Sequence, residues 1–410
     1  MSDKKVLVYI NLKGKDEFVG TLWSHFYRSK ETSDFEYSRD WLSNSKAFSL
    51  EPGLFLGAGK QVNPRKTSLF GSFSDSAPDT WGRILMRKYE AQLARENSRN
   101  PKTLNEIDFL LYVNDYARQG ALRFKTEEDD QFLWPGDLKS IPPLVQLSKL
   151  LYATEKIIDS EEKNTDLQLL LAPGSSLGGA RPKASVIDES GNLCIAKFPK
   201  KDDCSNNVLW ESIALTLAKS CGLNTQEWTL KKVANKDIII LKRFDRKEQE
   251  RIHFLSAMSM LNAVDNDAET HSYLDIADVI RQYGASPKED LVELWKRIVF
   301  SILISNTDDH LRNHGFLYVS EKGWKLSPLY DVNPSIDNKK VLSTYITEND
   351  NAQSIDLALE VCEYFGVSLK DANDIIADMK KRVSNWSLVA KNHGLAKKEV
   401  EQMASAFRLS

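Results

Sequence analysis

Several features that define other protein classes are scarce in this 410-residue sequence. The four cysteines, at positions 194, 204, 221 and 362, form no CxxC pair, which argues against a structural zinc site and a disulfide framework. The longest apolar run, IVFSILIS at 298–305, is far shorter than the roughly 20 residues of a membrane-spanning helix. We therefore expect reduced thiols and no membrane partner.

A large charge of one sign is also absent, since the formal net charge is −3. Without a strongly basic surface, tight direct binding of nucleic acid is not expected. The first residues, MSDKKVLVYINLKG, place a short apolar run between charged residues. That pattern predicts a β-strand and not a secretory signal, so a cytoplasmic protein is expected.

The periodicity of the apolar residues predicts an α+β fold in which strands precede helices. Strands are predicted at 5–23 (a hairpin with a turn near Gly14), 47–53, 54–59, 184–200 (two strands) and 236–246. Helices are predicted after a cap at Asp79 or Thr80, at 104–113, at 206–223, at 288–304 and, as a pair, within 368–408. The stretch from about 140 onwards is expected to be rich in strands.

The length of the chain implies two or three packed units. We predict a mixed N-terminal domain at 1–110, a strand-rich lobe at 111–245 and an all-helical C-terminal lobe at 246–410.

The segment PGSSLGGARPK at 173–183 precedes a predicted strand. Glycines let backbone N–H groups approach an anion closely, and Arg181 and Lys183 add positive charge, so the segment predicts a phosphate-binding loop. The alternative is a flexible surface hairpin. The loop is not of the Walker A type, because no GK[ST] closes it.

Lys197 lies within an apolar predicted strand, where an ammonium group needs a partner. Glu211, on the following predicted helix, is the expected counter-charge. Protein kinases hold the phosphates of ATP with a strand Lys that is paired with a helix Glu. The alternative is an edge-strand lysine that faces solvent.

The polar stretch SNTDDHLRNHGF at 305–316 follows an apolar helix. Asp308 and Asn313 have the spacing of the catalytic Asp and the metal-binding Asn of protein kinases. Asp331, in WKLSPLYDVNPS, adds a second metal-binding carboxylate, although Tyr330 before it means that there is no DFG. Phosphoryl transfer needs positioning, Mg²⁺ ligands and cations on the phosphates more than covalent chemistry. The ordered set of glycine loop, Lys, Glu, Asp, Asn and Asp therefore predicts a kinase.

The histidines leave an alternative from another class. His310 and His314 are four positions apart, and on one face of a helix near Asp308 they would suit a metallohydrolase. HxxxH lacks the glutamate of HExxH, however, so His310 is expected to be a partly buried hydrogen-bonding residue that positions the loop. Asp309 is expected to be solvated or to cap a helix.

Together these segments resemble the HipA family of bacterial toxin serine/threonine kinases over nearly the whole chain. The matching motifs are SSLGGARPK (glycine-rich loop), IAKFP (nucleotide lysine), ESIALTLAKSCGL (Glu-bearing helix), KRFDR (hinge), NTDDHLRN (catalytic loop) and LSPLYD (metal-binding motif). The initial hairpin and FSDSAPDTWGR are similar to the N-terminal domain of the family. The resemblance implies a HipA-like, two-lobed, protein-kinase-like fold.

The resemblance also implies ATP- and Mg²⁺-dependent phosphorylation of a serine or threonine in a protein substrate. Asp308 would be the catalytic Asp, Asn313 and Asp331 the Mg²⁺ ligands, and Glu211 the partner of Lys197 in a structural ion pair. The implied ATP site comprises Gly178, Gly179, Ala180, Arg181, Pro182, Lys183, Lys197, Lys242, Arg243, Phe244, His310, Asn313, Tyr330 and Asp331.

Ser176 matches the loop serine that the family autophosphorylates, with Ser175 as an alternative. A phosphate adds about −1.5 to −2 charge to a loop that must fold over phosphates. Autophosphorylation is therefore expected to eject the loop and to inactivate the kinase.

The family pairs with HipB-like antitoxins that have a helix-turn-helix, so DNA contact is expected only through the antitoxin. The best-known substrate of the family is glutamyl-tRNA synthetase, whose modification promotes dormancy. The substrate here stays open, because Asp309 and the ARP of the glycine loop depart from relatives with Gly and AQE. The alternatives are a small-molecule or lipid kinase of the same fold, and a silent module that binds an antitoxin or nucleotide.

Overall fold

The structure is a computed structural model that describes residues 3–28, 30–64, 67–133, 141–171, 179, 181–248, 250–265, 270–336 and 340–409. The chain forms two compact units. Unit 1 comprises Met1–Lys201 and Lys231–Val264, and unit 2 comprises Asp202–Leu230 and Asp265–Ser410. In the described part of the chain, no helix is long and apolar enough to cross a membrane.

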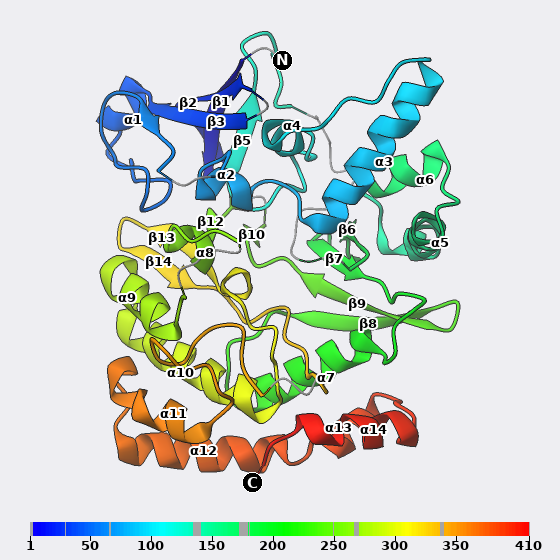
Figure 1. Ribbon diagram of the computed structural model, residues 1–410, viewed down its shortest axis with the longest axis vertical. Coiled ribbons are helices and arrows are strands. Elements are labelled where there is room, and N and C mark those ends of the chain that lie inside the picture. The colour runs from blue at the N-terminus through cyan, green and yellow to red at the C-terminus, as the bar shows by residue number, and fades with distance from the viewer. Residues whose placement is uncertain are drawn as a thin grey trace. The chain divides into compact units, whose positions relative to one another are not determined.

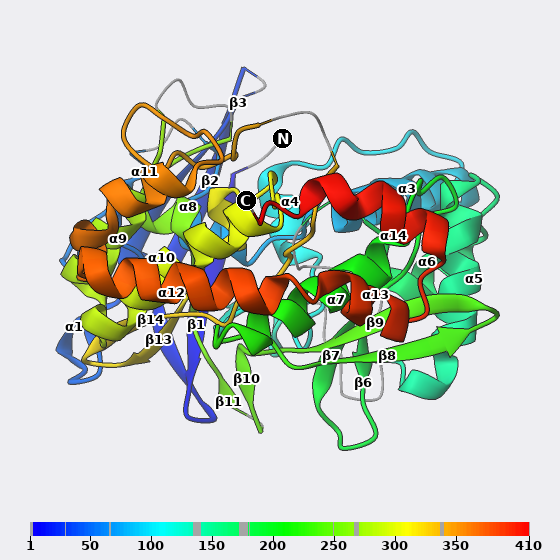
Figure 2. The same ribbon diagram turned by 90° about the horizontal axis from the view of Figure 1, so that it is seen from below.

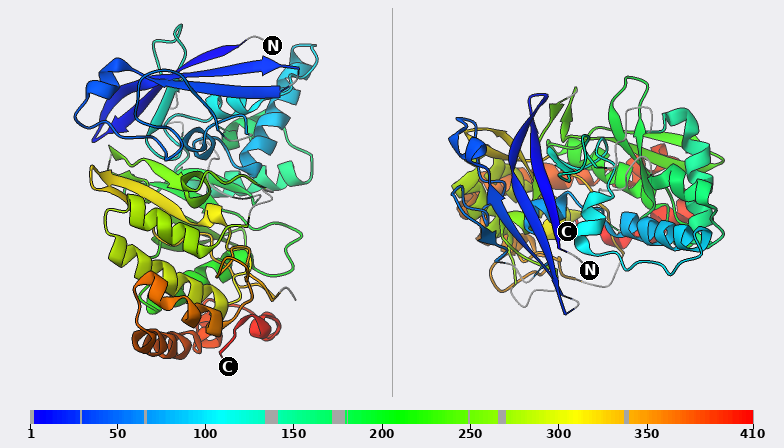
Figure 3. Two further views of the ribbon diagram at one scale, coloured as in Figure 1. Left: turned by 60° about the vertical axis from the view of Figure 1, so that its left-hand side comes forward. Right: turned by 90° about the horizontal axis from the view of Figure 1, so that it is seen from above.

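Unit 1 begins with a five-stranded sheet in the order β4-β3-β2-β1-β5, whose long antiparallel strands are seen in Figures 1 and 3. Its strands are β1 (Lys4–Leu12), β2 (Lys15–Tyr27), β3 (Lys30–Tyr37), β4 (Gln61–Val62) and β5 (Leu122–Lys125). Alternate residues of β1, Val6, Val8 and Ile10, are fully buried, because side chains along a strand point to opposite faces. The predicted hairpin is confirmed, with Lys13 and Gly14 in its turn.

Short helices cover the buried face of this first sheet. They are α1 (Arg39–Ser43), α2 (Gly71–Asp75) and α4 (Glu106–Leu111). The core extends to Phe124 on β5, so the first sheet reaches past residue 110. The division into three domains stays a prediction.

A second sheet, which lies mostly in unit 1, has the order β6-β7-β9-β8. Its strands are β6 (Lys183–Ile187), β7 (Leu193–Lys197), β8 (Trp228–Val233) and β9 (Lys236–Lys242). One face packs on α3 (Thr80–Glu96), α5 (Leu147–Ile158) and α6 (Asn164–Leu171), which lie together in Figures 1 and 2. The 3₁₀ turn η2 (Leu144–Gln146) precedes α5.

Unit 1 ends with short elements that continue from β9. They are β10 (Arg246–Lys247), β11 (Glu250–Arg251), β12 (Phe254–Ser256) and α8 (Ala257–Met260). The Ser256 side chain accepts a hydrogen bond from the Ser259 N–H group and so caps α8.

Unit 2 is mainly helical. Its elements are α7 (Asn207–Ser220), α9 (Tyr273–Tyr283), α10 (Pro287–Leu303), η3 (Leu311–Asn313), β13 (Gly315–Ser320), β14 (Gly323–Leu326), α11 (Ile355–Glu360), η4 (Cys362–Phe365), α12 (Leu369–Val383), α13 (Trp386–Asn392), α14 (Lys397–Met403) and η5 (Ala404–Ala406). The buried face of α10 includes Leu294, Trp295 and Ile298, all at 0% exposure. Figure 2 shows α12 as the long helix beside α10, which it contacts.

The α+β class is confirmed, and so are most of the predicted elements. The helix capped by Asp79, the hairpin of β6 and β7, and α4, α7, β9 and α10 form where the periodicity predicts them. Gly222 follows α7 with a φ of 74°, the left-handed conformation that favours glycine at a helix end. The C-terminal part is not all-helical, because β13 and β14 form an antiparallel hairpin.

Two predictions of strands are wrong. Residues 147–158 and 164–171 form α5 and α6, because their buried residues, among them Leu147, Leu150 and Leu151, recur at helical spacing. The segments 47–53 and 54–59 form no strand. Their main chain is held instead by Tyr37, whose hydroxyl accepts from the Leu50 N–H (2.9 Å) and donates to the Leu54 carbonyl (3.2 Å).

The prediction of two helices near the C-terminus is also wrong, because three form there. A turn at Ser384 and Asn385 separates α12 from α13, and Gly394 with a φ of 85° follows α13. The spacing of the apolar residues does not show where these helices are interrupted.

Candidate active site

The polar stretch 305–316 begins with a sharp reversal at the end of α10. Ser305 has a φ of 52°, a left-handed conformation that few residues other than glycine adopt. The Asn306 N–H donates back to the Ser301 carbonyl at 2.9 Å, and the Ser305 carbonyl accepts from the Ser335 N–H at 3.0 Å. The buried helix therefore fixes where the polar stretch starts.

Asp308 and Asp309 differ completely in environment although they are neighbours. The Asp308 side chain is exposed, and its carboxylate makes no hydrogen bond or ion pair with the described residues. Its main-chain carbonyl accepts from the His310 N–H (2.9 Å) and from the Asn313 side-chain amide (3.0 Å). The Asp308 backbone is thus held while its carboxylate faces outward.

Asp309 is only 2% exposed and lies at the centre of a hydrogen-bond network. The hydroxyl groups of Tyr273 (2.6 Å) and Ser301 (3.0 Å) donate to its Oδ2, and His314 Nε2 lies 3.1 Å from its Oδ1. The Thr344 hydroxyl donates to its main-chain carbonyl at 2.6 Å. The expectation that Asp309 is solvated or caps a helix is therefore wrong.

The groups around Asp309 favour the ionised form of its carboxyl group. Burial alone would raise the pKa of the carboxyl, but His314 and the donors on Tyr273 and Ser301 hold that pKa below its ordinary value. Burial, followed by the nearby Asp309 charge, raises the pKa of Tyr273 well above its ordinary value. Asp309 is therefore a buried anion held by neutral donors and a histidine.

The rest of the stretch does not form the helix on which His310 and His314 would share a face. His310 has an extended backbone, residues 311–313 form the short turn η3, and His314 is again extended. His314 is fully buried beside Asp309, whereas His310 is half-buried and its Nδ1 has no partner among the described residues. This geometry removes the basis of the metallohydrolase alternative.

Asp331 follows β14 and the sequence SPLY. It has a φ of 55°, which is a left-handed backbone conformation, and the chain bends at this residue. The preceding Tyr330 donates its hydroxyl to the Arg312 carbonyl at 2.5 Å, and the Asn333 N–H donates to the Asn306 side chain at 3.3 Å. These bonds place the Asp331 turn beside the 305–316 stretch.

The residues in this part of unit 2 fit a magnesium ion. Mg²⁺ binds oxygen ligands, chiefly carboxylates, together with water. The Asn313 amide nitrogen donates to the Asp308 carbonyl, which leaves the amide oxygen as the atom that can bind a cation. With the Asp331 carboxylate, the donor set is all oxygen. Among the described residues, no group of three or more His, Cys, Asp and Glu suits a metal ion. The assignment of Asn313 and Asp331 as Mg²⁺ ligands stays a prediction.

Lys197 ends β7 and is 9% exposed. In the register of the second sheet it pairs with Lys183 on β6 and with Ile239 on β9. The neighbouring Ala196 belongs to the core under the helices, so Lys197 lies on the opposite face of the sheet. Its pairing with Glu211, which is buried on α7 of unit 2, stays a prediction.

The glycine loop lies largely outside the described residues, and so do Ser175, Ser176, Gly178 and Ala180. Gly179 is described and has a φ of 85°. Pro182 accepts at its carbonyl from the Phe198 N–H (2.9 Å), which ties the end of the loop to the residue after Lys197. Arg181 is half-buried. The assignment of this loop to phosphate stays a prediction.

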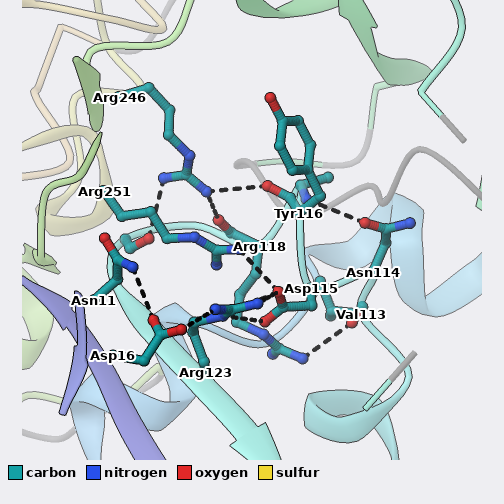
Figure 4. A network of polar contacts seen from close by, with 12 residues as sticks. Asn11, Asp16, Val113, Asn114, Asp115, Tyr116, Arg118, Arg123, Arg246 and Arg251 are labelled. Atoms are coloured by element: carbon teal, nitrogen blue, oxygen red, sulfur yellow. Dashed lines mark hydrogen bonds and ion pairs between the residues drawn. The ribbon is translucent and has the colours of Figure 1, made fainter. Parts of the chain in front are cut away.

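The KRFDR segment of unit 1 belongs to a largely buried network of charges, and Figure 4 shows the part of it around Arg246 and Asp115. The network consists of Arg118, Arg123, Arg243, Arg246 and Arg251 with Asp16, Asp115 and Asp245. The Arg243 guanidinium is 1% exposed; it binds Asp245 and donates to the carbonyls of Ala117 and Arg118. Its side chain is therefore engaged within unit 1, and a contact of Lys242, Arg243 or Phe244 with nucleotide stays a prediction that would use backbone groups.

Burial and ion pairing oppose each other in this network. Burial alone would raise the pKa of Asp245, but Arg243 and Arg246 lower it to about 2. Burial lowers the pKa of Arg118 and of Arg246 to about 9. Asp245 also accepts from the Gly120 N–H at 2.7 Å, so the network holds the 114–120 loop against KRFDR.

The contacts of two residues at the candidate site were not predicted from the sequence. Asp309 has the same local context as Asp308, and its donors Tyr273 and Thr344 are each more than 30 positions away. Asp79 was identified only as a helix cap, yet its carboxylate also binds Lys183 at 2.7 Å. No local pattern signals either contact.

Comparison with known proteins is consistent with this geometry. A curated relative from Haemophilus influenzae, named "Putative kinase", is 28% identical over 181 residues, which are 38% of this chain and 52% of the relative. One from Sinorhizobium fredii, named "Putative kinase Y4mE", is 23% identical over 178 residues, or 38% of this chain and 41% of the relative. The chain thus matches about half the length of these relatives.

The fold is shared with a solved structure. The HipA of the Shewanella oneidensis MR-1 toxin–antitoxin complex, solved with HipB and operator DNA, superposes with a TM-score of 0.68 at 16% identity and covers 98% of this chain and 94% of that chain. At this identity the likeness concerns the fold. The family model for the HipA-like C-terminal domain matches residues 175–387. That range is more than half of the sequence, and this chain therefore belongs to the family of proteins with a HipA-like C-terminal domain.

Proposed function

We propose that this chain is a kinase that transfers the γ-phosphoryl group of ATP to a serine or threonine of a protein. The observation that supports this most is the exposed Asp308 carboxylate, on a backbone held by Asn313 and next to the buried anion Asp309. A residue that accepts a proton must be reachable by the substrate yet fixed in position, and this loop meets both conditions.

In this proposal each residue has its own role in the reaction. Asp308 orients the attacking hydroxyl and accepts its proton, while the oxygen forms a bond to the γ-phosphorus and the bond to the β-phosphate bridging oxygen breaks, releasing ADP. Asn313 and Asp331 hold Mg²⁺, which neutralises phosphate charge when bound. Lys197 contacts the phosphates from the sheet, with Glu211 as its partner.

The proposed setting is a toxin–antitoxin system. The family membership and the fold shared with a HipA that was solved with HipB and operator DNA support a HipB-like antitoxin as the partner. DNA would then be contacted through that partner, in accordance with the net charge of −3. The substrate would be a protein with a target serine or threonine, an aminoacyl-tRNA synthetase being one candidate, and phosphorylation of Ser176 or Ser175 would inactivate the kinase.

The test is incubation of the purified chain with radiolabelled ATP and Mg²⁺, followed by mapping of phosphate by mass spectrometry. We expect incorporation on Ser176 or Ser175, and loss of at least 100-fold in rate for Asp308→Asn, the size typical of losing a general base. The matched control is Asp374→Asn on α12, an exposed carboxylate without contacts to the described residues.

The outcomes separate the alternatives. Binding of ATP with release of ADP but no phosphate on protein would favour a small-molecule or lipid kinase. Binding of ATP without any turnover would favour a silent regulatory module. A wild-type chain that does not bind ATP in the presence of Mg²⁺ would contradict the proposal.

A further inference from the structure

The buried ion pair between Asp79 and Lys183 lies outside the residues that the kinase assignment uses. The ammonium of Lys183 is 2.7 Å from Asp79 Oδ2, and the two side chains are 2% and 6% exposed. Asp79 comes from the N-terminal segment, 96 positions before the residues that match the family model begin. Lys183 is the last residue of the glycine loop and the first of β6.

Asp79 makes two different contacts with its two carboxylate oxygens. Oδ1 accepts from the Gly82 N–H at 2.8 Å and caps α3, while Oδ2 binds Lys183. The same first turn of α3 adds a third contact, because the Trp81 indole N–H donates to the Lys183 carbonyl at 3.1 Å. The start of α3 therefore contacts both the side chain and the main chain of Lys183.

The Lys183 ammonium also reaches back into the loop. It donates to the Gly179 carbonyl at 3.2 Å, where Gly179 has the left-handed φ of 85°. The ammonium thus closes a short ring across the loop end, with Asp79 as the anchor. This contact holds the Gly179 carbonyl beside the start of β6.

Charge explains why an anchor is needed at this place. Lys183 and Lys197 are directly paired across β6 and β7, which puts their Cβ atoms roughly 5 Å apart on one face of the sheet. Both lysines are at least 91% buried, and two like charges this close destabilise each other unless one is neutralised. The Asp79 carboxylate supplies that neutralisation for Lys183.

We propose that Asp79 is a positioning residue for the end of the nucleotide loop at Lys183. It holds the Lys183 ammonium in a structural role, so that Lys197 is the sheet lysine that contacts phosphate. The inference rests on the proposed kinase function for its effect on ATP, although the Asp79–Lys183 contact itself does not. It gives the N-terminal segment an indirect part in nucleotide binding, through Lys183. It also replaces the expected role of Lys183 as a direct phosphate ligand.

The variants can separate the ion pair from the helix cap. Asp79→Asn keeps an oxygen for the Gly82 N–H, and Asn is as good a cap as Asp, but it removes the charge that faces Lys183. Lys183→Met removes the other partner, and Lys183→Arg keeps the charge. Glu106→Gln is the matched control, because it breaks another ion pair of α3, between Glu106 and Arg83 (2.5 Å).

The experiment uses the full chain and measures binding of a non-hydrolysable ATP analogue with Mg²⁺ by calorimetry, together with KM and kcat for ATP. We expect roughly tenfold weaker binding and a matching rise of KM for Asp79→Asn and for Lys183→Met, with little change in kcat. The double variant should be no weaker than either single variant, because both remove one interaction. Lys183→Arg and Glu106→Gln should bind like the wild type.

A second measurement does not depend on ATP. Hydrogen exchange of the peptide that contains Gly179 and Lys183, without nucleotide, should be faster in Asp79→Asn than in the wild type and in Glu106→Gln. This arm still tests the positioning role if the wild type fails to bind nucleotide, an outcome that would overturn the kinase proposal alone.

Two results would overturn the inference. One is an Asp79→Asn variant that binds nucleotide and exchanges hydrogen like the wild type. The other is a Lys183→Met defect much larger than that of Asp79→Asn and additive with it, which would show that the Lys183 ammonium contacts phosphate directly. Thermal unfolding of each variant identifies any that fails to fold, and Lys183→Arg then remains informative because it retains the ion pair.

Discussion

Two polar networks hold candidate functional segments of this chain by different means. In unit 1, arginines and aspartates hold the KRFDR segment against the 114–120 loop, and Figure 4 shows the part of this network around Arg246 and Asp115. In unit 2, one carboxylate, Asp309, is held by two hydroxyl groups and a histidine beneath the 305–316 stretch. The first network joins several formal charges, whereas the second combines a single carboxylate with His314 and two hydroxyl donors.

The two networks differ in composition because they hold different kinds of segment in place. Arginine has five donors in a rigid fork, so Arg243 and Arg246 together reach carbonyls of Tyr116, Ala117, Arg118 and Gly120 while they bind Asp245. That suits a loop without regular structure, whose main-chain carbonyls need partners. Beneath Asp308 a single anion with the hydroxyl groups of Tyr273 and Ser301 as donors fixes one position in the chain.

The largest effect is expected from breaking the arginine network at its centre. Asp245→Ala would leave the buried guanidinium groups of Arg243 and Arg246 without their carboxylate, and the loss of one partner of a buried ion pair costs about 3–5 kcal/mol. We expect that loss in the free energy of unfolding measured in urea, in a transition that involves unit 1. A change below 1 kcal/mol would mean that the guanidinium–carbonyl bonds alone hold the loop.

A smaller loss of stability but a larger loss of activity is expected at Asp309. Asp309→Asn keeps an acceptor for the hydroxyl groups but removes the charge beside His314, at a cost of about 1–3 kcal/mol. Because the backbone of Asp308 would shift, phosphoryl transfer should fall at least tenfold, as a misplacement of about 1 Å can cost 100-fold. Asp374→Asn serves as the control for activity and for unfolding.

The Asp309 experiment also separates this residue from Asp308. Asp308→Asn should abolish transfer and leave the free energy of unfolding almost unchanged, since Asp308 is exposed and its carboxylate contacts no described residue. If both variants unfold alike and lose activity alike, the distinct roles assigned to the two carboxylates are wrong.

A further prediction concerns how the free energy of unfolding depends on pH through Asp245. The pKa of Asp245 is lowered to about 2 from its ordinary 3.8, so its contribution is complete above pH 3.8 and is lost as the pH falls through about 2. The difference in pKa corresponds to about 2 kcal/mol. Unfolding curves of the wild type and Asp245→Asn should therefore converge as the pH is lowered from 5 to 2. Curves that stay parallel over that range would contradict the charge-based account.

Local sequence predicted much of the fold because many elements depend on short-range patterns. The hairpin of β1 and β2, the strands β6 and β7, and the helix α10 all arise from periodic apolar residues with turn or cap residues at their ends. The same reasoning failed at 47–59, where the chain is held by Tyr37 and has no ladder. Contacts with a side chain from another element cannot be inferred from the pattern of the segment itself.

The candidate site divides in the same way. The spacing of Asp308 and Asn313 within one stretch, and the position of Asp331 after a strand, are properties of the sequence and predict the type of chemistry. Sequence could not tell which of two adjacent aspartates is buried, because that depends on Tyr273, Ser301 and Thr344 from three other segments.

By itself, then, the sequence determined the kind of residues at the site, their order and the local elements that present them, since those follow from periodicity and spacing. Only the tertiary structure decided that Asp309 is a buried anion, that Arg243 is committed within unit 1 and that Asp79 neutralises Lys183. The physical reason is that burying a charge is costly without a partner, and the partners come from residues far away in the chain.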